Sequence, residues 1–268
     1  MFSKILAIFK RDLITATSYR LAFISQFFLP LFVVLSFFFL SQLLGEASLT
    51  GLNQYGGEYF PFVLVGIVFT TYTSVFLSSV VSTIRRGQTM GTLELVLTTR
   101  TSLGTYLAGS SVYALLQGTI VVALFLVVGV FVFGVDFQGA NFAVGILVLV
   151  LSMVIMIGLG IIAGSFVLVY KQGDPFSLLI NFGAFLLSGV VYPVAVLPSW
   201  LQAGSMMLPH TYALEALRMA LLQGASASQV SPQLGALVLF AVGSISASYL
   251  LFTYAVSRAK IEGSLAQY

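Results

Sequence analysis

Hydrophobic residues along this chain occur in long runs, and the short stretches between the runs hold nearly all of the charged residues. A helix of about 20 residues is needed to cross a bilayer core of roughly 30 Å, and a charge at its centre costs about 2.5–3.5 kcal/mol. The uncharged runs therefore predict an all-α polytopic membrane protein with six transmembrane helices. The predicted spans are 21–44, 60–83, 104–133, 140–169, 175–193 and 233–256.

The fifth run, residues 175–214, is too long for one span and is broken by Pro193, Pro198 and Pro209. We predict that residues 197–223 form two short outer re-entrant helices between spans 5 and 6, with a break near Pro209. Trp and Tyr favour the headgroup level of a membrane. The polar and aromatic residues of this segment suit either an outer gate or an interfacial anchor. These residues are Trp200, Tyr212, Glu215 and Arg218.

The composition agrees with a membrane protein. Of the 268 residues, 59% are hydrophobic and 7% are charged, and the mean hydropathy is +1.07. A water-soluble domain of this length does not need so much apolar surface, so we expect residues 1–268 to form one membrane domain. The chain has no Cys and one His, which excludes disulfides and argues against a metal site.

The distribution of Lys and Arg indicates the orientation. Cytoplasmic loops of membrane proteins are enriched in these residues. With the N-terminus inside, every Lys and Arg except Arg218 falls in an inner segment. We therefore predict an N-in/C-in topology. The net charge of +3 then reflects loop placement, and the expected partner is the lipid bilayer, with no nucleic acid.

Residues 3–19 are predicted to form an amphipathic helix before the first span. Leu6, Phe9, Leu13 and Ala16 recur at helical spacing, whereas the basic residues lie mostly off this stripe. This pattern suggests a helix that lies in the inner headgroup plane. The alternative is a plain cytoplasmic extension of the first span.

The second span carries a polar stripe. Hydroxyl side chains recur every four residues along it, at Thr70, Ser74, Ser78 and Ser82. In lipid, a hydroxyl must find a partner, so the stripe is expected to face protein or water. It suits the wall of a translocation path or helix–helix packing. In the fourth span, Gly160 and Gly164 form a close-packing motif.

The chain shows no energy source of its own. It contains no Gly-Lys pair and therefore no phosphate-binding loop of the G-x-x-x-x-G-K-[ST] type. No carboxylate falls in the middle of a predicted span, although secondary transporters often use one for ion coupling. If the protein moves a substrate uphill, the energy has to come from a partner.

The stretch 85–100, RRGQTMGTLELVLTTR, is the candidate contact for such a partner. Leu93, Val96 and Leu97 recur at helical spacing, which favours a short amphipathic helix at the inner surface. A soluble subunit could grip this helix. The alternative is a cytoplasmic loop with a solvated charged face. The bordering arginines are Arg85, Arg86 and Arg100.

The segment GTLELVLTT at 91–99 resembles the signature of ATP-binding-cassette (ABC) transporter permeases of the type-2 exporter family, which have the type V exporter fold. The segments SGVVYPVAVLPSWLQ (188–202) and LPHTYALEALR (208–218) are similar to the family's stretch between spans 5 and 6. The six-span pattern agrees with the family along the whole chain. Two features depart from its pattern: basic Arg85 and Arg86 replace the acidic residues usual before this signature, and Arg100 replaces the usual proline.

The resemblance implies a permease that pairs with a second permease, usually a copy of itself, and with two copies of a soluble ABC ATPase subunit. The chain itself would need no cofactor, and ATP and Mg would bind to the partner ATPase, so the chain would not be an enzyme. By resemblance, the coupling helix that docks in the ATPase includes Gly91, Thr92, Leu93 and Glu94. The resemblance also implies that the amphipathic helix at 3–19 is the family's interface helix.

The expected function is export of an amphipathic or lipid-like compound across a bacterial or archaeal cytoplasmic membrane. A polysaccharide or lipid-linked glycan is the alternative substrate. An ATP-independent channel or secondary carrier is a further alternative, and it would need an ion site in the spans.

Overall fold

The computed structural model describes residues 2–44, 52, 57–91, 99, 103–170 and 175–261. Within these ranges the chain forms helices and no strands. The helices are α1 (Phe2–Ser18), α2 (Arg20–Leu44), α3 (Tyr59–Thr89), α5 (Leu103–Phe131), α6 (Phe142–Tyr170), α7 (Pro175–Leu187), the 3-10 helix η2 (Val194–Val196), α8 (Ser199–Ser205), α9 (Pro209–Gln223) and α10 (Ser231–Ile261).

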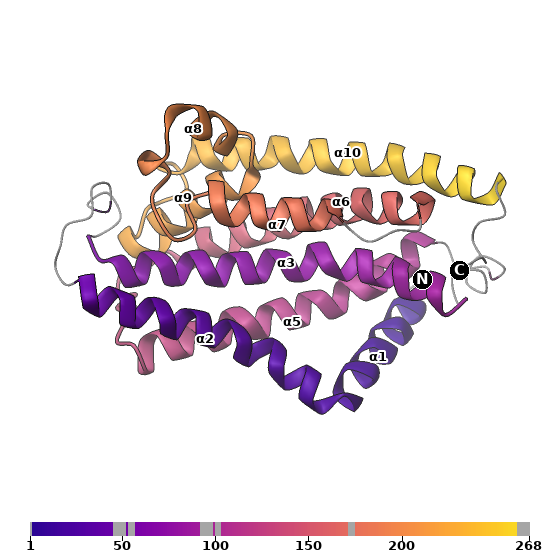
Figure 1. The fold of residues 1–268 in the computed structure, drawn as a ribbon, viewed down its shortest axis with the longest axis horizontal. Coiled ribbons are helices and arrows are strands. Elements are labelled where there is room, and N and C mark those ends of the chain that lie inside the picture. The colour runs from indigo at the N-terminus through magenta and orange to yellow at the C-terminus, as the bar shows by residue number, and fades with distance from the viewer. Residues whose placement is uncertain are drawn as a thin grey trace.

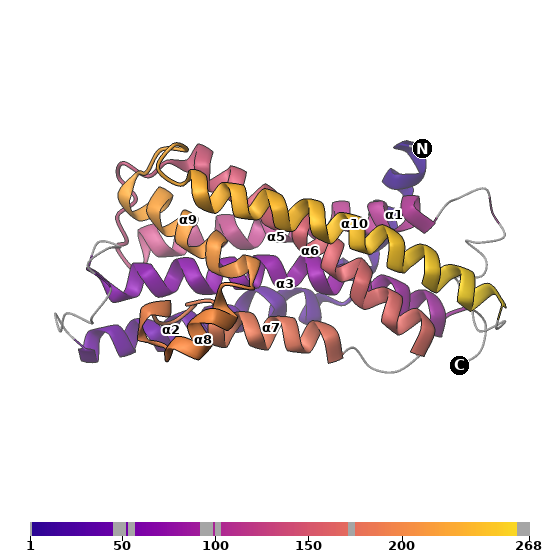
Figure 2. The same ribbon diagram turned by 90° about the horizontal axis from the view of Figure 1, so that it is seen from above.

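Five helices in the described part of the chain are long and apolar enough to cross a membrane: α2, α3, α5, α6 and α10. They correspond to predicted spans 1 to 4 and 6. The all-helical polytopic prediction is therefore confirmed. The start of α1 and the end of α10 lie at the same end of the bundle, as do the last turns of α3 (Figures 1 and 2).

Helix α3 lies in the middle of the bundle, with α2, α5, α6, α7 and α9 around it (Figures 1 and 2). The close-packing motif of α6 faces α3. A Cβ atom at Gly160 would lie 2.9 Å from the carbonyl oxygen of Leu77, and one at Gly164 would overlap the side chain of Ile84. The two glycines therefore let the backbones of α3 and α6 approach closely.

Helix α7 is shorter than predicted. We expected a span over 175–193, but the helix ends at Leu187 after 13 residues, which is too short to cross a bilayer core by itself. The chain turns at Gly189, whose φ of +77° suits glycine. This turn frees the carbonyl oxygen of Val190 to accept a hydrogen bond from Arg218, which a continuing helix would not allow.

Helix α1 is a separate element and does not extend the first span. The chain bends at Tyr19, between α1 and α2, and α1 runs at a large angle to the other helices (Figure 1). It packs along α5. Ile8 lies so close to Gly109 that a Cβ atom there would stand 2.7 Å from the Ile8 side chain.

The segment between α7 and α10 forms the 3-10 helix η2 and two short α-helices, α8 and α9, which are separated by a break at residues 206–208. The break lies where Pro209 predicted it. Helix α9 begins beside the middle of α3, where Nε2 of His210 lies 3.3 Å from Oγ1 of Thr73. It ends beside the α5–α6 turn, where Ala220 accepts a hydrogen bond from the backbone N–H of Asn141 at 2.8 Å.

Candidate functional site: a polar stripe with two cavities

The hydroxyl stripe predicted on the second span lies on α3, and its hydroxyl protons are used within the helix. The donors and their acceptor carbonyls are Thr70 to Gly66 at 2.9 Å, Ser74 to Thr71 at 2.9 Å, Ser78 to Ser74 at 2.7 Å and Ser82 to Ser79 at 3.1 Å. Each hydroxyl oxygen still has lone pairs that can accept a hydrogen bond. The hydroxyl groups of the stripe therefore carry no charge, already donate their protons within α3, and can still accept hydrogen bonds from a ligand.

Two cavities open on this stripe and share Ser74. The first cavity, of about 490 Å³, lies between α1, α3 and α5 and is lined by Ser74, Ser78 and Ser82. It is called the inner cavity because it lies towards the end of the bundle where α1 begins and α3 ends. The middle cavity, of about 480 Å³, lies between α2, α3 and α7 and is lined by Thr70 and Ser74. All four predicted path residues thus border open space. None of them is fully buried against a neighbouring helix.

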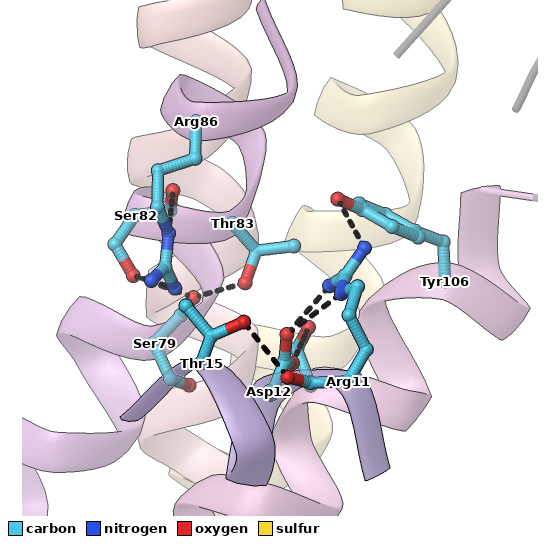
Figure 3. A network of polar contacts seen from close by, with 9 residues as sticks. Arg11, Asp12, Thr15, Ser79, Ser82, Thr83, Arg86 and Tyr106 are labelled. Carbon is cyan, nitrogen blue, oxygen red and sulfur yellow. Dashed lines mark hydrogen bonds and ion pairs between the residues drawn. The ribbon is translucent and has the colours of Figure 1, made fainter. Parts of the chain in front are cut away.

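One wall of the inner cavity belongs to a polar network between α1 and α5, of which Asp12 and Ser110 line the cavity (Figure 3). Arg11 donates to Oδ1 of Asp12 at 2.7 and 2.9 Å, and Ser110 donates to Oδ2 of Asp12 at 2.9 Å. Arg11 also donates to the hydroxyl of Tyr106 at 3.3 Å and lies over its ring, 5.1 Å from the centroid. These contacts tie α1 to α5.

The network raises the pKa of Arg11, a side chain that is charged at physiological pH in any surroundings. Burial acts to lower the pKa of Arg11, but the hydrogen bonds to Asp12 and Tyr106 and the charge of Asp12 raise the pKa overall. Asp12, on the wall of the cavity, is therefore matched by a permanent positive charge at 2.7 Å.

Arg86 lines the same cavity from the last turns of α3. Its Nε donates to the carbonyl oxygen of Ser82 at 3.2 Å, and its Nη2 to the Ser82 hydroxyl at 3.4 Å, so the guanidinium folds back along α3 (Figure 3). Among the described residues, no carboxylate lies within ion-pair distance of Arg86.

The predicted outer-gate residues do not form one cluster. Arg218 is 3% exposed and donates to two backbone carbonyls, of Phe62 at 3.1 Å and of Val190 at 2.9 Å. Trp200, on α8, is 73% exposed. The Tyr212 hydroxyl donates to the carbonyl of Met206 at 3.0 Å, and Glu215 is half-buried on α9.

The predicted coupling residues are divided by the structure. Arg85 and Arg86 belong to α3, which continues to Thr89, and Gly91 follows the end of that helix. The predicted range 85–100 therefore starts inside α3. The remaining predicted contacts lie outside the described residues. They are Thr92, Leu93, Glu94 and Arg100.

Sequence reasoning missed the role of Asp12, Tyr106 and Ser110. Asp12 is the one acidic residue of α1, and an acid in an otherwise basic helix was the available signal. Its partners on α5 could not be named, because nothing local links the two helices. In the part of the chain that the structure describes, no three His, Asp or Glu residues gather into a metal-binding group.

Comparison with known proteins agrees with this architecture. The sequence profile of the ABC-2 type transporter family matches residues 3–222. The chain is 25% identical over 188 residues to the probable multidrug ABC transporter permease YbhR of Escherichia coli strain K12 and to the protein of the same name from Escherichia coli O157:H7. The alignment covers 70% of this chain and 48% of each relative, so the chain spans about half the length of the curated relatives it matches.

Proposed function

The chain belongs to the ABC-2 type transporter family, and we propose that it is the permease subunit of an ATP-driven exporter that moves an amphipathic or lipid-like compound out across a bacterial or archaeal cytoplasmic membrane. Members of this family are membrane subunits of transporters and are not themselves catalytic. In this proposal, two copies of a separate ABC ATPase hydrolyse ATP with Mg, and this chain converts their movement into transport.

The observation that carries the proposal is the polar stripe of α3. It runs from Thr70 to Ser82 and borders both cavities, in a helix without a charged residue between Tyr59 and Ile84. The hydroxyls ease the passage of a polar headgroup, but they do not take up and release a proton as a carboxylate does, so the stripe offers no proton relay. A path of this kind favours an exporter powered from outside the chain over a secondary carrier.

The proposed topology has six crossings with both chain ends inside. The fifth crossing consists of α7 together with the segment that follows it, because α7 itself is only 13 residues long. Helices α8 and α9 then lie on the outer side, and α9 rises from the middle of α3 to the α5–α6 turn. Placing the start of α1 and the end of α10 at the same end of the bundle supports this arrangement (Figure 1).

A second permease is proposed to cover the middle cavity. The cavity is open between α2 and α7, where polar Thr70 and Asn181 stand beside Leu29 and Phe185. In lipid, polar groups on an open face are costly, whereas a partner protein or water can satisfy them. A copy of this chain placed against α2 and α7 would enclose the path between the two permeases.

The coupling contact is proposed to lie around Gly91 and Glu94, at the inner end of α3. Movement of an ATPase gripping this segment would reach α3 directly, because α3 ends at Thr89. The stripe on α3 is then the element that shifts between the two states of the transporter. Because the same stripe presents hydroxyl acceptors, a lipid-linked glycan is the second candidate substrate.

The proposal is tested by Glu94→Arg, made alongside Glu58→Arg. The control reverses the same charge at the opposite end of α3. The chain is purified with its ATPase, and ATP-driven transport of a fluorescent phospholipid is measured in vesicles. We expect Glu94→Arg to abolish co-purification of the ATPase and transport, and Glu58→Arg to keep both. Transport without any nucleotide-hydrolysing partner would remove the exporter assignment.

A further inference from the structure

We propose that the inner cavity between α1, α3 and α5 is a binding site for the headgroup of a phosphate-bearing lipid with hydroxyl groups, and that Arg86 binds its phosphate. This inference concerns binding and does not depend on export. The proposed topology determines only which leaflet of the membrane supplies the lipid.

The size and shape of the cavity suit a lipid headgroup. Its volume is about 490 Å³, within the range of about 300–1,000 Å³ typical of small-molecule sites. Its lining on α3 runs from Ser74 to Met90, which at 1.5 Å per residue is about 24 Å along the helix. A site of this length is open to an elongated amphiphile.

The charges of the cavity call for an anion. Asp12 is neutralised by Arg11 at 2.7 Å and by the hydrogen bond from Ser110. Arg86 is the remaining charged residue of the lining, and no described carboxylate pairs with it. The cavity therefore has an excess of one positive charge, which a phosphodiester monoanion would balance.

The guanidinium of Arg86 retains hydrogen-bonding capacity. Its hydrogen bonds to Ser82 use Nε and one N–H of Nη2, out of the five N–H donors of the group. The free donors of a guanidinium match the paired oxygens of a phosphate. The weak bond from Nη2 to the Ser82 hydroxyl, at 3.4 Å, can be exchanged at low cost.

The hydroxyl stripe selects the rest of the headgroup. Ser78 and Ser82 donate their protons to carbonyls of α3, so towards the cavity they offer oxygen lone pairs. A headgroup that carries hydroxyl donors can use these acceptors, whereas one without donors cannot. A glycerol or sugar joined to the phosphate fits both the stripe and Arg86.

The opposite wall suits an apolar chain. Ala16, Tyr19 and Phe23 line the cavity at the corner between α1 and α2. The cavity is thus polar along α3 and apolar at the α1–α2 corner, as an amphiphile requires.

The test uses the full chain purified in detergent, with no ATPase and no ATP. It is titrated with dioleoyl phosphatidylglycerol, with dioleoylglycerol and with inorganic phosphate, and bound ligand is measured by native mass spectrometry. We expect saturable binding of phosphatidylglycerol, and weak binding of dioleoylglycerol, which lacks the phosphate. Equal binding of the two lipids would overturn the proposal. If inorganic phosphate binds as tightly as the lipid and with the same dependence on Arg86, the site binds a free anion and the lipid proposal is wrong.

Two variants locate the site. Arg86→Gln removes the charge, and we expect it to weaken phosphatidylglycerol binding about tenfold, the effect of one lost charge-assisted hydrogen bond. Ser78→Phe fills the cavity without changing the charge and should also weaken binding. The matched control Arg85→Gln removes the same charge from the neighbouring residue, which does not line the cavity, and should keep lipid binding. If Arg85→Gln and Arg86→Gln weaken lipid binding equally, the lipid is attracted to basic residues in general, and the proposed site is contradicted.

Because ATP and the ATPase are absent from this measurement, its failure leaves the exporter assignment standing. A failure of the Glu94→Arg experiment in turn leaves the lipid site standing.

Discussion

Nη2 of Arg218, on α9, lies 2.9 Å from the carbonyl oxygen of Val190, in the turn that follows α7. The same guanidinium donates to the carbonyl of Phe62 on α3 and lies 3.4 Å from the centroid of the Phe62 ring. One buried side chain on α9 therefore joins α9, α3 and the turn after α7. It was expected at an outer gate, and the structure places it where these elements meet.

Replacing Arg218 by Met should destabilise the protein. The variant keeps much of the side-chain volume but leaves the two carbonyls without this donor, each at a cost of about 1–3 kcal/mol when buried. We expect a lower midpoint of thermal unfolding in detergent, followed by tyrosine and tryptophan fluorescence. Arg20→Met, at an exposed position of α2, is the control and should change stability by less than about 0.5 kcal/mol. Equal midpoints for the two variants would contradict this role of Arg218.

Gly66→Ala tests the same junction from the side of α3. A Cβ atom at Gly66 would overlap the carbonyl oxygen of Val190 and lie 3.0 Å from Nη2 of Arg218. Overpacking of this kind costs about 1–3 kcal/mol. Gly243→Ala is the matched control, because a Cβ atom there would meet nothing within 4 Å and alanine favours a helix. Thermal unfolding should separate the two variants, with Gly66→Ala the less stable; the opposite order would refute the close approach.

Asp12→Asn should loosen α1 from α5. The substitution removes the ion pair with Arg11 and weakens the hydrogen bond from Ser110. The loss is modest, about 0.2–1 kcal/mol, because the Arg11 side chain is 47% exposed. The chain has no native Cys, so a spin label on Leu6→Cys reports on α1 alone.

We expect higher mobility of that label in Asp12→Asn. Asp136→Asn, in the α5–α6 turn at the far end of the bundle, should leave the label unchanged. If the label moves equally freely in the parent and in Asp12→Asn, the network does not hold α1.

The proposed orientation can be tested with single cysteines at two exposed positions. Thr89→Cys lies at the end of α3 that we propose to be inside, and Gln138→Cys lies in the α5–α6 turn. In intact cells, a membrane-impermeant maleimide should label Gln138→Cys and not Thr89→Cys, and permeabilisation should make both reactive. The reverse pattern would invert the topology and with it the proposed coupling contact.

Much of the fold could be predicted from the sequence. The apolar runs located α2, α3, α5, α6 and α10, and Pro209 marked the break before α9. The hydroxyl stripe could also be recognised in the sequence, because its residues recur at the spacing of one helix face. These features depend on residues close to one another in the chain, because the length of an apolar run sets whether a helix can cross a bilayer.

Only the tertiary structure decided where α7 ends, what Arg218 contacts and how α1 is held. Arg218 and Phe62 are 156 residues apart in the sequence, and Asp12 and Ser110 are 98 apart. No local pattern specifies such a pair, because the donor and the acceptor meet only after the helices between them have packed. The inner cavity could not be predicted for the same reason. The sequence determined that α3 has a polar face, but only the packing of α1 and α5 against α3 decided that this face borders open space next to Arg86.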